Sequence, residues 1–97
     1  MPYRLTERAA RDLEEILVEG ILQFGPIQAL RYQDSFRRTF ELIADLPRVG
    51  RRSQSEDERR FVHGSHIIFY RIGTDGVVIE SIEHGSTLRD PWGEEGP

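Results

Sequence analysis

The amino-acid sequence predicts a single α+β domain over residues 1–97, with an N-terminal strand, a helical hairpin and a small antiparallel sheet in that order. Two long segments carry apolar residues at the spacing of a helix, and Gly25-Pro26 separates them. Beyond them, three short stretches are rich in Val, Ile, Phe and Tyr, as strands are. Because the helices precede most of the strands, we expect both helices to cover one face of the sheet.

The chain is expected to begin with a short strand from Tyr3 to Leu5. Thr6 is the predicted N-cap of the first helix, because its hydroxyl can accept a hydrogen bond from an amide that the helix leaves unpaired. The helix is predicted to run from Glu7 to Phe24. The apolar positions of its expected buried stripe are Ala9, Leu13, Ile16, Leu17, Ile21 and Phe24.

The second helix is expected to begin at Pro26, since proline at the first helical position loses no needed hydrogen bond, while Gly25 can end the first helix. Pro47 is expected to stop it after Asp45-Leu46. Its apolar face consists of Ala29, Tyr32, Phe36, Phe40 and Ile43. The aromatic members are interpreted as core. A connection this tight predicts that the two helices pack antiparallel.

The segment from Arg48 to Glu58 is polar and has no periodic apolar face, so it is predicted to be a surface loop. Three antiparallel strands in a meander are predicted at Arg59 to Val62, Ser65 to Ile72 and Val77 to Glu83. The last of these has Val77, Val78 and Ile79 in succession, which directs apolar side chains to both faces. Part of the sheet is therefore expected to stay uncovered by helices and to accept a partner.

Residues 86–97 carry little helix or strand signal and are expected to form a flexible C-terminal tail. Trp92 is its one potential anchor, and we include it among the candidate residues for contact with a partner.

Composition excludes several classes of site. The absence of cysteine removes disulfides, thiolate metal sites and cysteine nucleophiles, and three scattered histidines do not predict a metal site, so no cofactor is expected. All 13 basic residues are arginine, yet the net charge is −4, opposite to the charge of a typical nucleic-acid-binding protein. No apolar run is long enough to span a bilayer and no signal-peptide core follows Met1. A cytoplasmic protein without membrane or direct nucleic-acid contact is expected.

Three residues are singled out as candidates for function. Arg60 and Arg71 bracket a hydrophobic strand pair and could form planar forks to the carboxylates of a bound peptide. His84 ends the last predicted strand, where sheets expose functional groups. By contrast, Arg51 and Arg52 are interpreted as part of a solvated, salt-bridged surface. No Gly-rich phosphate loop, paired-carboxylate motif or nucleophile elbow is present.

The segment from Arg60 to Arg71, which reads Arg-Phe-Val-His-Gly-Ser-His-Ile-Ile-Phe-Tyr-Arg, resembles the signature hairpin of ParE toxins. Further pieces of the family pattern occur in the same order over about Tyr3 to Gly85. They are Tyr3-Arg4-Leu5-Thr6 with Asp12-Leu13 and Ile16, Phe24-Gly25 with Ala29 and Tyr32, and Pro47-Arg48-Val49-Gly50-Arg51.

This resemblance implies the fold of the ParE/RelE superfamily and the role of the toxin in a type II toxin–antitoxin system. Such a toxin is neutralised by a cognate ParD-like antitoxin, whose C-terminal segment wraps the helical hairpin and the sheet. ParE-like members poison DNA gyrase by binding to it and catalyse no reaction themselves. The resemblance thus implies growth arrest through protein–protein binding, with Arg60, Arg71, His84 and Trp92 as candidate contacts.

Two alternatives remain open. A RelE-like ribosome-dependent mRNA endonuclease would use Arg60, Arg71 and His84 around a ribose 2′-hydroxyl and its phosphate, although Glu83 beside His84 would repel that phosphate. A non-toxic module that only binds its antitoxin is the other. The residues after His84 depart from the family, whose members follow this point with an Arg-rich stretch and an apolar ending.

Overall fold

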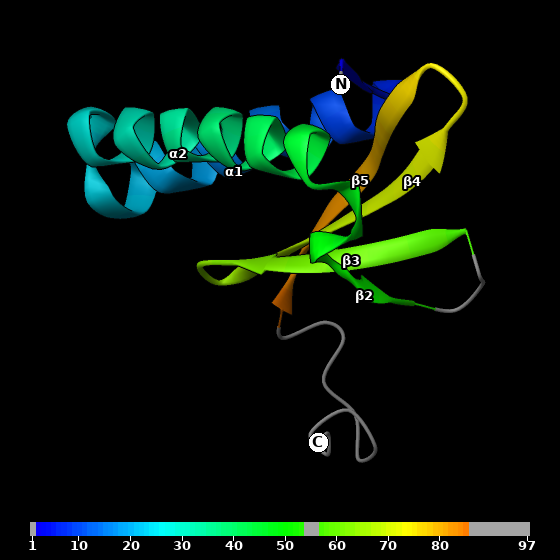
Figure 1. The fold of residues 1–97 in the computed structure, drawn as a ribbon. Helices are drawn as coiled ribbons and strands as arrows, with labels where there is room; N and C mark the ends of the chain where they lie inside the picture. Colours follow the sequence, from blue (N-terminus) through cyan, green and yellow to red (C-terminus); the bar gives the residue numbers. More distant parts are fainter. Residues whose placement is uncertain (1, 54–56, 86–97) are drawn as a thin grey trace, which may run out of the picture.

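A computed structural model describes residues 2–53 and 57–85, in which two helices cover one face of a five-stranded sheet (Figure 1). The elements are β1 (Tyr3–Leu5), α1 (Glu7–Phe24), α2 (Pro26–Asp45), the 3-10 helix η1 (Pro47–Val49), β2 (Arg51–Arg52), β3 (Glu58–His63), β4 (His66–Gly73) and β5 (Gly76–His84). The predicted tail of residues 86–97, with Trp92, lies outside the described residues.

The sheet has the strand order β1-β5-β4-β3-β2 and is mixed. The strands β3, β4 and β5 form the predicted antiparallel meander, and β1 pairs with β5 in parallel, with Arg4 opposite Val78. The α+β fold class is confirmed. The N-terminal strand therefore lies beside the last strand of the chain, and a bulge in β5 at Glu80 interrupts the register between Phe69 and Tyr70.

Thr6 caps α1 as predicted and also ties this helix to the sheet. Its Oγ1 accepts a hydrogen bond from the Ala9 amide at 3.0 Å and donates one to the Glu80 carbonyl at 2.8 Å. On the next turn, Asp12 Oδ2 accepts a hydrogen bond from the Ile82 amide at 2.9 Å. The N-terminal half of α1 is thus fixed to β5.

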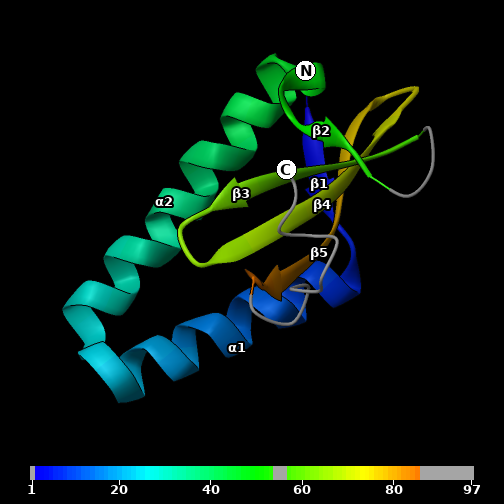
Figure 2. The same cartoon turned by 90° about the horizontal axis from the view of Figure 1, so that it is seen from below.

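Gly25, at a φ of 90°, connects the helices in a conformation that residues with side chains rarely adopt. The two helices contact each other closely at Gly20 and Ala29, where a Cβ on Gly20 would lie 3.1 Å from that of Ala29. From this end the helices diverge over the sheet (Figure 2).

The buried stripe of α1 is shorter than predicted. Ala9 and Ile16 are buried and Leu13 packs on the core, but Ile21 is 39% exposed and Phe24 is 65% exposed. Both lie at the end of the hairpin, where less of the sheet is opposite the helices. The prediction that they are buried was wrong, because spacing identifies a face of a helix but not how far the opposing sheet extends.

The core lies between the diverging helices and the central strands β4 and β5. Its largest fully buried side chains are Tyr70, Phe36, Ile43, Ile68, Ile79 and Val77. Phe36 and Phe40 are core residues as predicted, with exposed fractions of 0% and 2%. Tyr32 is only half-buried, at the edge of this core.

Part of the segment predicted to be a loop is ordered as η1 and β2. Arg51 and Arg52 pair with Arg60 and Arg59 of β3. Tyr70 fixes the preceding turn, since its hydroxyl donates to the Pro47 carbonyl at 2.6 Å and accepts from the Gly50 amide at 2.8 Å. The segment is held by its pairing with β3 and by Tyr70, and it exposes both arginines. Its sequence therefore shows no apolar periodicity that would predict a strand.

Within residues 2–53 and 57–85, neither helix has the length and apolar character needed to cross a membrane.

Candidate functional site

The sheet face opposite the helices, here called the outer face, carries both candidate arginines. Arg60 of β3 is opposite Phe69 of β4, and Arg71 lies two residues beyond Phe69 on the same strand. Because side chains two residues apart point to one face of a strand, Arg60 and Arg71 are diagonal neighbours about 7 Å apart at the backbone. The apolar side chains of Val62 and Ile67 continue this face, and Val62 is 65% exposed.

Arg71 is already held by an acidic partner on its own face. Its Nε donates to Glu80 Oε2 at 2.7 Å, and the two side chains are 43% and 32% exposed. The bulge at Glu80 places this carboxylate beside Arg71. Such a partly exposed pair orients the guanidinium but contributes only about 0–1 kcal/mol to stability.

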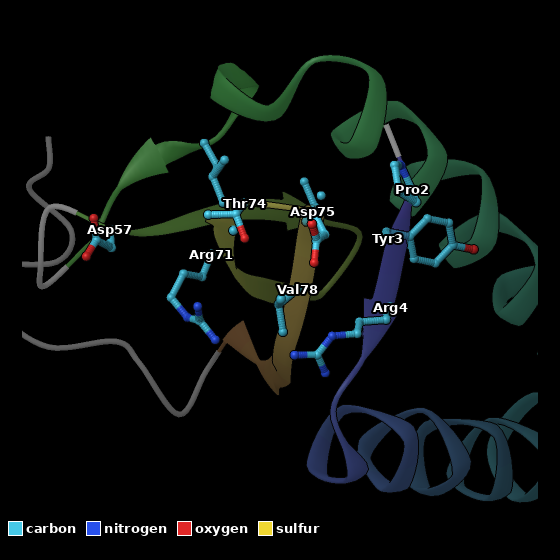
Figure 3. A pocket seen from close by; sticks show the side chains of 12 residues that line it. Pro2, Tyr3, Arg4, Asp57, Arg71, Thr74, Asp75 and Val78 are labelled. Carbon is cyan, nitrogen blue, oxygen red and sulfur yellow. The ribbon is translucent and has the colours of Figure 1, made fainter.

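A cleft of about 640 Å³ opens beside Arg71 at the end of the sheet formed by the β4–β5 turn (Figure 3). Arg4 and Tyr3 of β1 and Val78 of β5 contribute to its lining, together with Ile72, Gly73, Thr74, Asp75, Gly76, Val77, Pro2 and Asp57. Arg4 was not identified from the sequence. The signal available was the alternation of β1, in which the apolar Tyr3 and Leu5 face the core and Arg4 faces away.

All three histidines lie at the opposite end of the sheet, on the face toward the helices. His63 ends β3, and His66 of β4 is paired with His63 and with His84 of β5. The rings of His66 and His84 meet edge to face with centroids 5.2 Å apart. His66 lies near the start of the strand that the sequence predicts from Ser65 to Ile72, and it is buried and belongs to this cluster.

Three hydroxyl groups of α2 bind two of these imidazoles. Ser35 Oγ and Thr39 Oγ1 lie 2.8 Å and 3.0 Å from Nε2 and Nδ1 of His63, and Tyr32 Oη lies 2.8 Å from Nδ1 of His66. Ser35 donates its own hydrogen to the Tyr32 carbonyl. The Nε2 of neutral His63 must therefore carry the proton, and its Nδ1 accepts from Thr39.

Burial favours the neutral form of two of the imidazoles. It lowers the pKa of His63 below the ordinary 6.5. It also lowers the pKa of His66, where the neighbouring His84 acts in the same direction and Glu19 opposes it. A positive charge on His66 is therefore disfavoured by burial and by the neighbouring His84 imidazole.

A cleft of about 470 Å³ lies beside this cluster, between the helical hairpin and the sheet. Tyr32, Ser65, His66 and His84 form its polar side. The hairpin supplies the other side, through Ile16, Glu19, Gly20, Gln23, Phe24, Gln28 and Ala29. Among the described residues, the lining contains no arginine and one carboxylate, which suits an amphipathic protein segment better than a phosphate.

The structure does not bring together the three residues proposed for a nuclease. Arg60 and Arg71 share the outer face, whereas His84 is opposite His66 on the helix side. Along β4, the positions opposite His84 and at Arg71 are separated by roughly 16 Å. Trp92 lies outside the described residues. Among residues 2–53 and 57–85, no group of three or more His, Asp or Glu is placed to hold a metal ion.

Comparison with known proteins assigns the chain to a family. Residues 3–89 match the model of the ParE toxin of the type II toxin–antitoxin system parDE. Toxin ParE1 of Caulobacter vibrioides is 33% identical over 90 residues, which are 91% of this chain and 94% of that protein.

Two solved structures share the fold. One, described as a chromosomal ParDE toxin–antitoxin system from P. aeruginosa, has a TM-score of 0.76 at 20% identity and covers 87% of this chain and 95% of its own. The other, from the toxin–antitoxin complex RelBE2 of Mycobacterium tuberculosis, has a TM-score of 0.51 at 22% identity, with coverages of 84% and 94%. The chain has the RelE/ParE-like fold and belongs to the ParE toxin family of type II toxin–antitoxin systems.

Proposed function

We propose that this ParE toxin inhibits DNA gyrase by binding to it, catalyses no reaction itself, and is neutralised by a cognate ParD-like antitoxin. The observation that carries the proposal is the separation of its candidate polar groups. Arg60 and Arg71 lie on the outer face, and His84 lies on the other face at the far end of β4. General acid–base cleavage of RNA needs such groups within hydrogen-bond reach of one phosphate.

The surfaces of the protein suit protein partners. The end of the hairpin exposes a group of large apolar side chains, with exposed fractions of 55% for Val18, 81% for Leu22, 65% for Phe24, 70% for Ile27 and 55% for Leu30. Large apolar side chains exposed at one end of an element are suited to protein–protein contacts. An amphipathic antitoxin segment that covers them would follow the pattern of helix-in-groove recognition.

The negative net charge supports a protein target over a nucleic acid. With a net charge of −4, the chain lacks the overall electrostatic attraction that most nucleic-acid-binding proteins have. Gyrase itself is the target that family membership suggests, and no contact residue for it is assigned.

The decisive experiment incubates purified toxin with gyrase and relaxed plasmid, and separately with translating ribosomes and message. We expect loss of supercoiling and accumulation of cleaved DNA, both prevented by equimolar antitoxin, with the message left intact. Cleavage of ribosome-bound message that is lost in His84→Gln or Arg71→Gln would instead establish the endonuclease. Normal growth of cells that accumulate folded toxin without antitoxin would establish the non-toxic module.

A further inference from the structure

We propose that Arg4 and Arg71 together form a binding site for a carboxylate on an acidic segment of a partner protein. The proposed function leaves Arg71 as a candidate contact and does not involve Arg4, so the paired site and its ligand go beyond it. The two can also fail separately, because carboxylate binding is measurable without gyrase.

The two arginines lie in one cross-strand row. Arg4 of β1 is opposite Val78 of β5, and Val78 is opposite Arg71 of β4. Residues that are opposite each other point to the same face, and two strand spacings separate the outer members by about 10 Å at the backbone. Figure 3 shows both side chains in the cleft, one on either side of Val78.

The burial of Val78 supports this arrangement. It is only 7% exposed, although it faces away from both helices. Long arginine side chains cover apolar surface with their stems and keep their guanidinium groups in water. Arg4 and Arg71 flank Val78, so stems that cover it in this way would also hold the two charged groups near each other.

Arg71 of this row has acidic neighbours on two sides, because Glu58 of β3 is opposite it and Glu80 of β5 is bound to it, so within the described residues the charge of the row that has no bound counterion is that of Arg4. The Arg71 guanidinium is bound to Glu80 through Nε, so its two terminal nitrogens can still form a fork to a second carboxylate. Arg4 is exposed, and within residues 2–53 and 57–85 its side chain forms no ion pair or hydrogen bond. Two neighbouring positive charges repel each other, and an anion between them removes this repulsion.

The surroundings select a single carboxylate over a chain of phosphates. Asp57 and Asp75 line the same cleft, and Glu80 lies beside Arg71. A nucleic-acid strand would bring several phosphates close to these carboxylates, whereas one Asp or Glu side chain between Arg4 and Arg71 brings a single negative charge near them. Ile72, Val77 and Val78 also line the cleft. We therefore expect the acidic residue of the partner to have apolar neighbours.

The test follows the side-chain Nε–H resonances of the arginines by NMR. The full-length protein is titrated with the peptide acetyl-Leu-Glu-Val-Glu-Leu-amide, and in parallel with the same peptide carrying Gln for Glu. The acidic peptide should shift the Arg4 and Arg71 signals in a saturable way, and the amide peptide should bind at least about fivefold more weakly. Affinity should fall as salt is added.

Arg4→Gln is the informative variant, because Arg4 has no partner within the described residues whose loss would disturb the fold. It should weaken binding of the acidic peptide about fivefold, and the Arg71 signal should then respond less. Arg11→Gln is the matched control, since Arg11 is exposed on α1 and does not line the cleft.

Three results would overturn the inference: equal response to both peptides, equal effects of the Arg4 and Arg11 substitutions, or no shift at about 5 mM peptide, a concentration that detects even millimolar affinity. A single-stranded oligothymidylate that shifts Arg4 and Arg71 when the peptide does not would identify a nucleic-acid site instead. If gyrase is not inhibited but the peptide binds, only the proposed function fails.

Discussion

At the scale of single residues, a few buried hydroxyl and imidazole groups join segments that are distant in sequence. Tyr70 links the central strand β4 to the turn before β2, and Tyr32 links α2 to the β3–β4 turn. Burial raises the pKa of Tyr70 above 10.0, so its hydroxyl stays protonated and can donate at neutral pH. Each group satisfies polar atoms that would otherwise be unpaired away from water.

Removal of the Tyr70 hydroxyl should therefore lower the free energy of unfolding by more than the size of this group suggests. Tyr70→Phe leaves the Pro47 carbonyl and the Gly50 amide without their partner, and we expect a loss of about 1–3 kcal/mol in the free energy of unfolding. Urea denaturation measures this loss. Tyr3→Phe is the control, because its hydroxyl has no hydrogen bond among the described residues, and it should change stability little. Equal effects of the two substitutions would contradict this account.

The histidine cluster predicts that acid destabilises the protein. The pKa values of His63 and His66 are lowered in the fold, so between about 6.5 and those lowered values the unfolded chain binds more protons than the native state. The stabilising contribution is complete above pH 6.5 and is lost as the pH falls through this window. Denaturation at a series of pH values between about 7.5 and 5.5 measures it, in a range where most carboxylates stay ionised.

Imidazole NMR titration assigns this effect to its residues. His63 and His66 should titrate below about 6.5 in the folded protein. His66→Gln should reduce the slope of stability against pH. Titration of both imidazoles at or above 6.5, or a stability that does not change with pH in this range, would show that burial does not hold them neutral.

At the scale of elements, the ends of the helices determine how they meet the sheet. Thr6 serves both elements at once, as the cap of α1 and as a hydrogen-bond donor to β5. The bulge of β5 at Glu80 supplies the carbonyl that Thr6 binds and the carboxylate that Arg71 binds. A substitution at this junction therefore affects both α1 and the outer face.

Thr6→Ala should destabilise the protein by about 1 kcal/mol or more, since a lost N-cap alone costs about 0.5–2 kcal/mol. For a domain of this size, each kcal/mol lowers the melting temperature by roughly 4–8 °C. Thr6→Ser keeps the hydroxyl and is the matched control, with most of the stability retained. If serine were as destabilising as alanine, the methyl group and not the cap would be responsible.

At the scale of the whole molecule, the hairpin extends apolar side chains past the part of the sheet that could bury them. Such a domain folds with a modest margin of stability, and a partner that binds only the folded state adds to it. An antitoxin at about 100 times its dissociation constant would add about 2.7 kcal/mol. The exposed end of the hairpin is the surface from which we expect part of this stabilisation.

Leu22→Gln tests this role of the hairpin. Leu22 is 81% exposed, so the melting temperature of the free toxin should stay nearly unchanged. The complex with the antitoxin should weaken by about 1 kcal/mol or more, which calorimetric titration measures. Leu46→Gln, at the other end of α2 and 56% exposed, is the control and should bind normally. Equal binding by Leu22→Gln and the unchanged toxin would exclude the hairpin end from the interface.

The sequence by itself determined the local elements and the family. Caps, glycine and proline signals and apolar spacing depend on near neighbours, and they located both helices and the meander to within a residue or two. The segment from Arg60 to Arg71 identified the ParE family, which the comparisons confirm. The short β2 escaped prediction because it is paired with β3, and because the turn before it is fixed by the hydrogen bond between Tyr70 and the Gly50 amide.

Only the tertiary structure decided which side chains meet. Parallel pairing of β1 with β5 brings Arg4 next to Val78 and Arg71, although 67 positions separate Arg4 from Arg71 in the sequence. The register of β4 and β5 places His84 beside His66 on the helix side and away from Arg71. Strand order and register depend on long-range hydrogen bonds and core packing, and the alternation of a single strand cannot specify its neighbours.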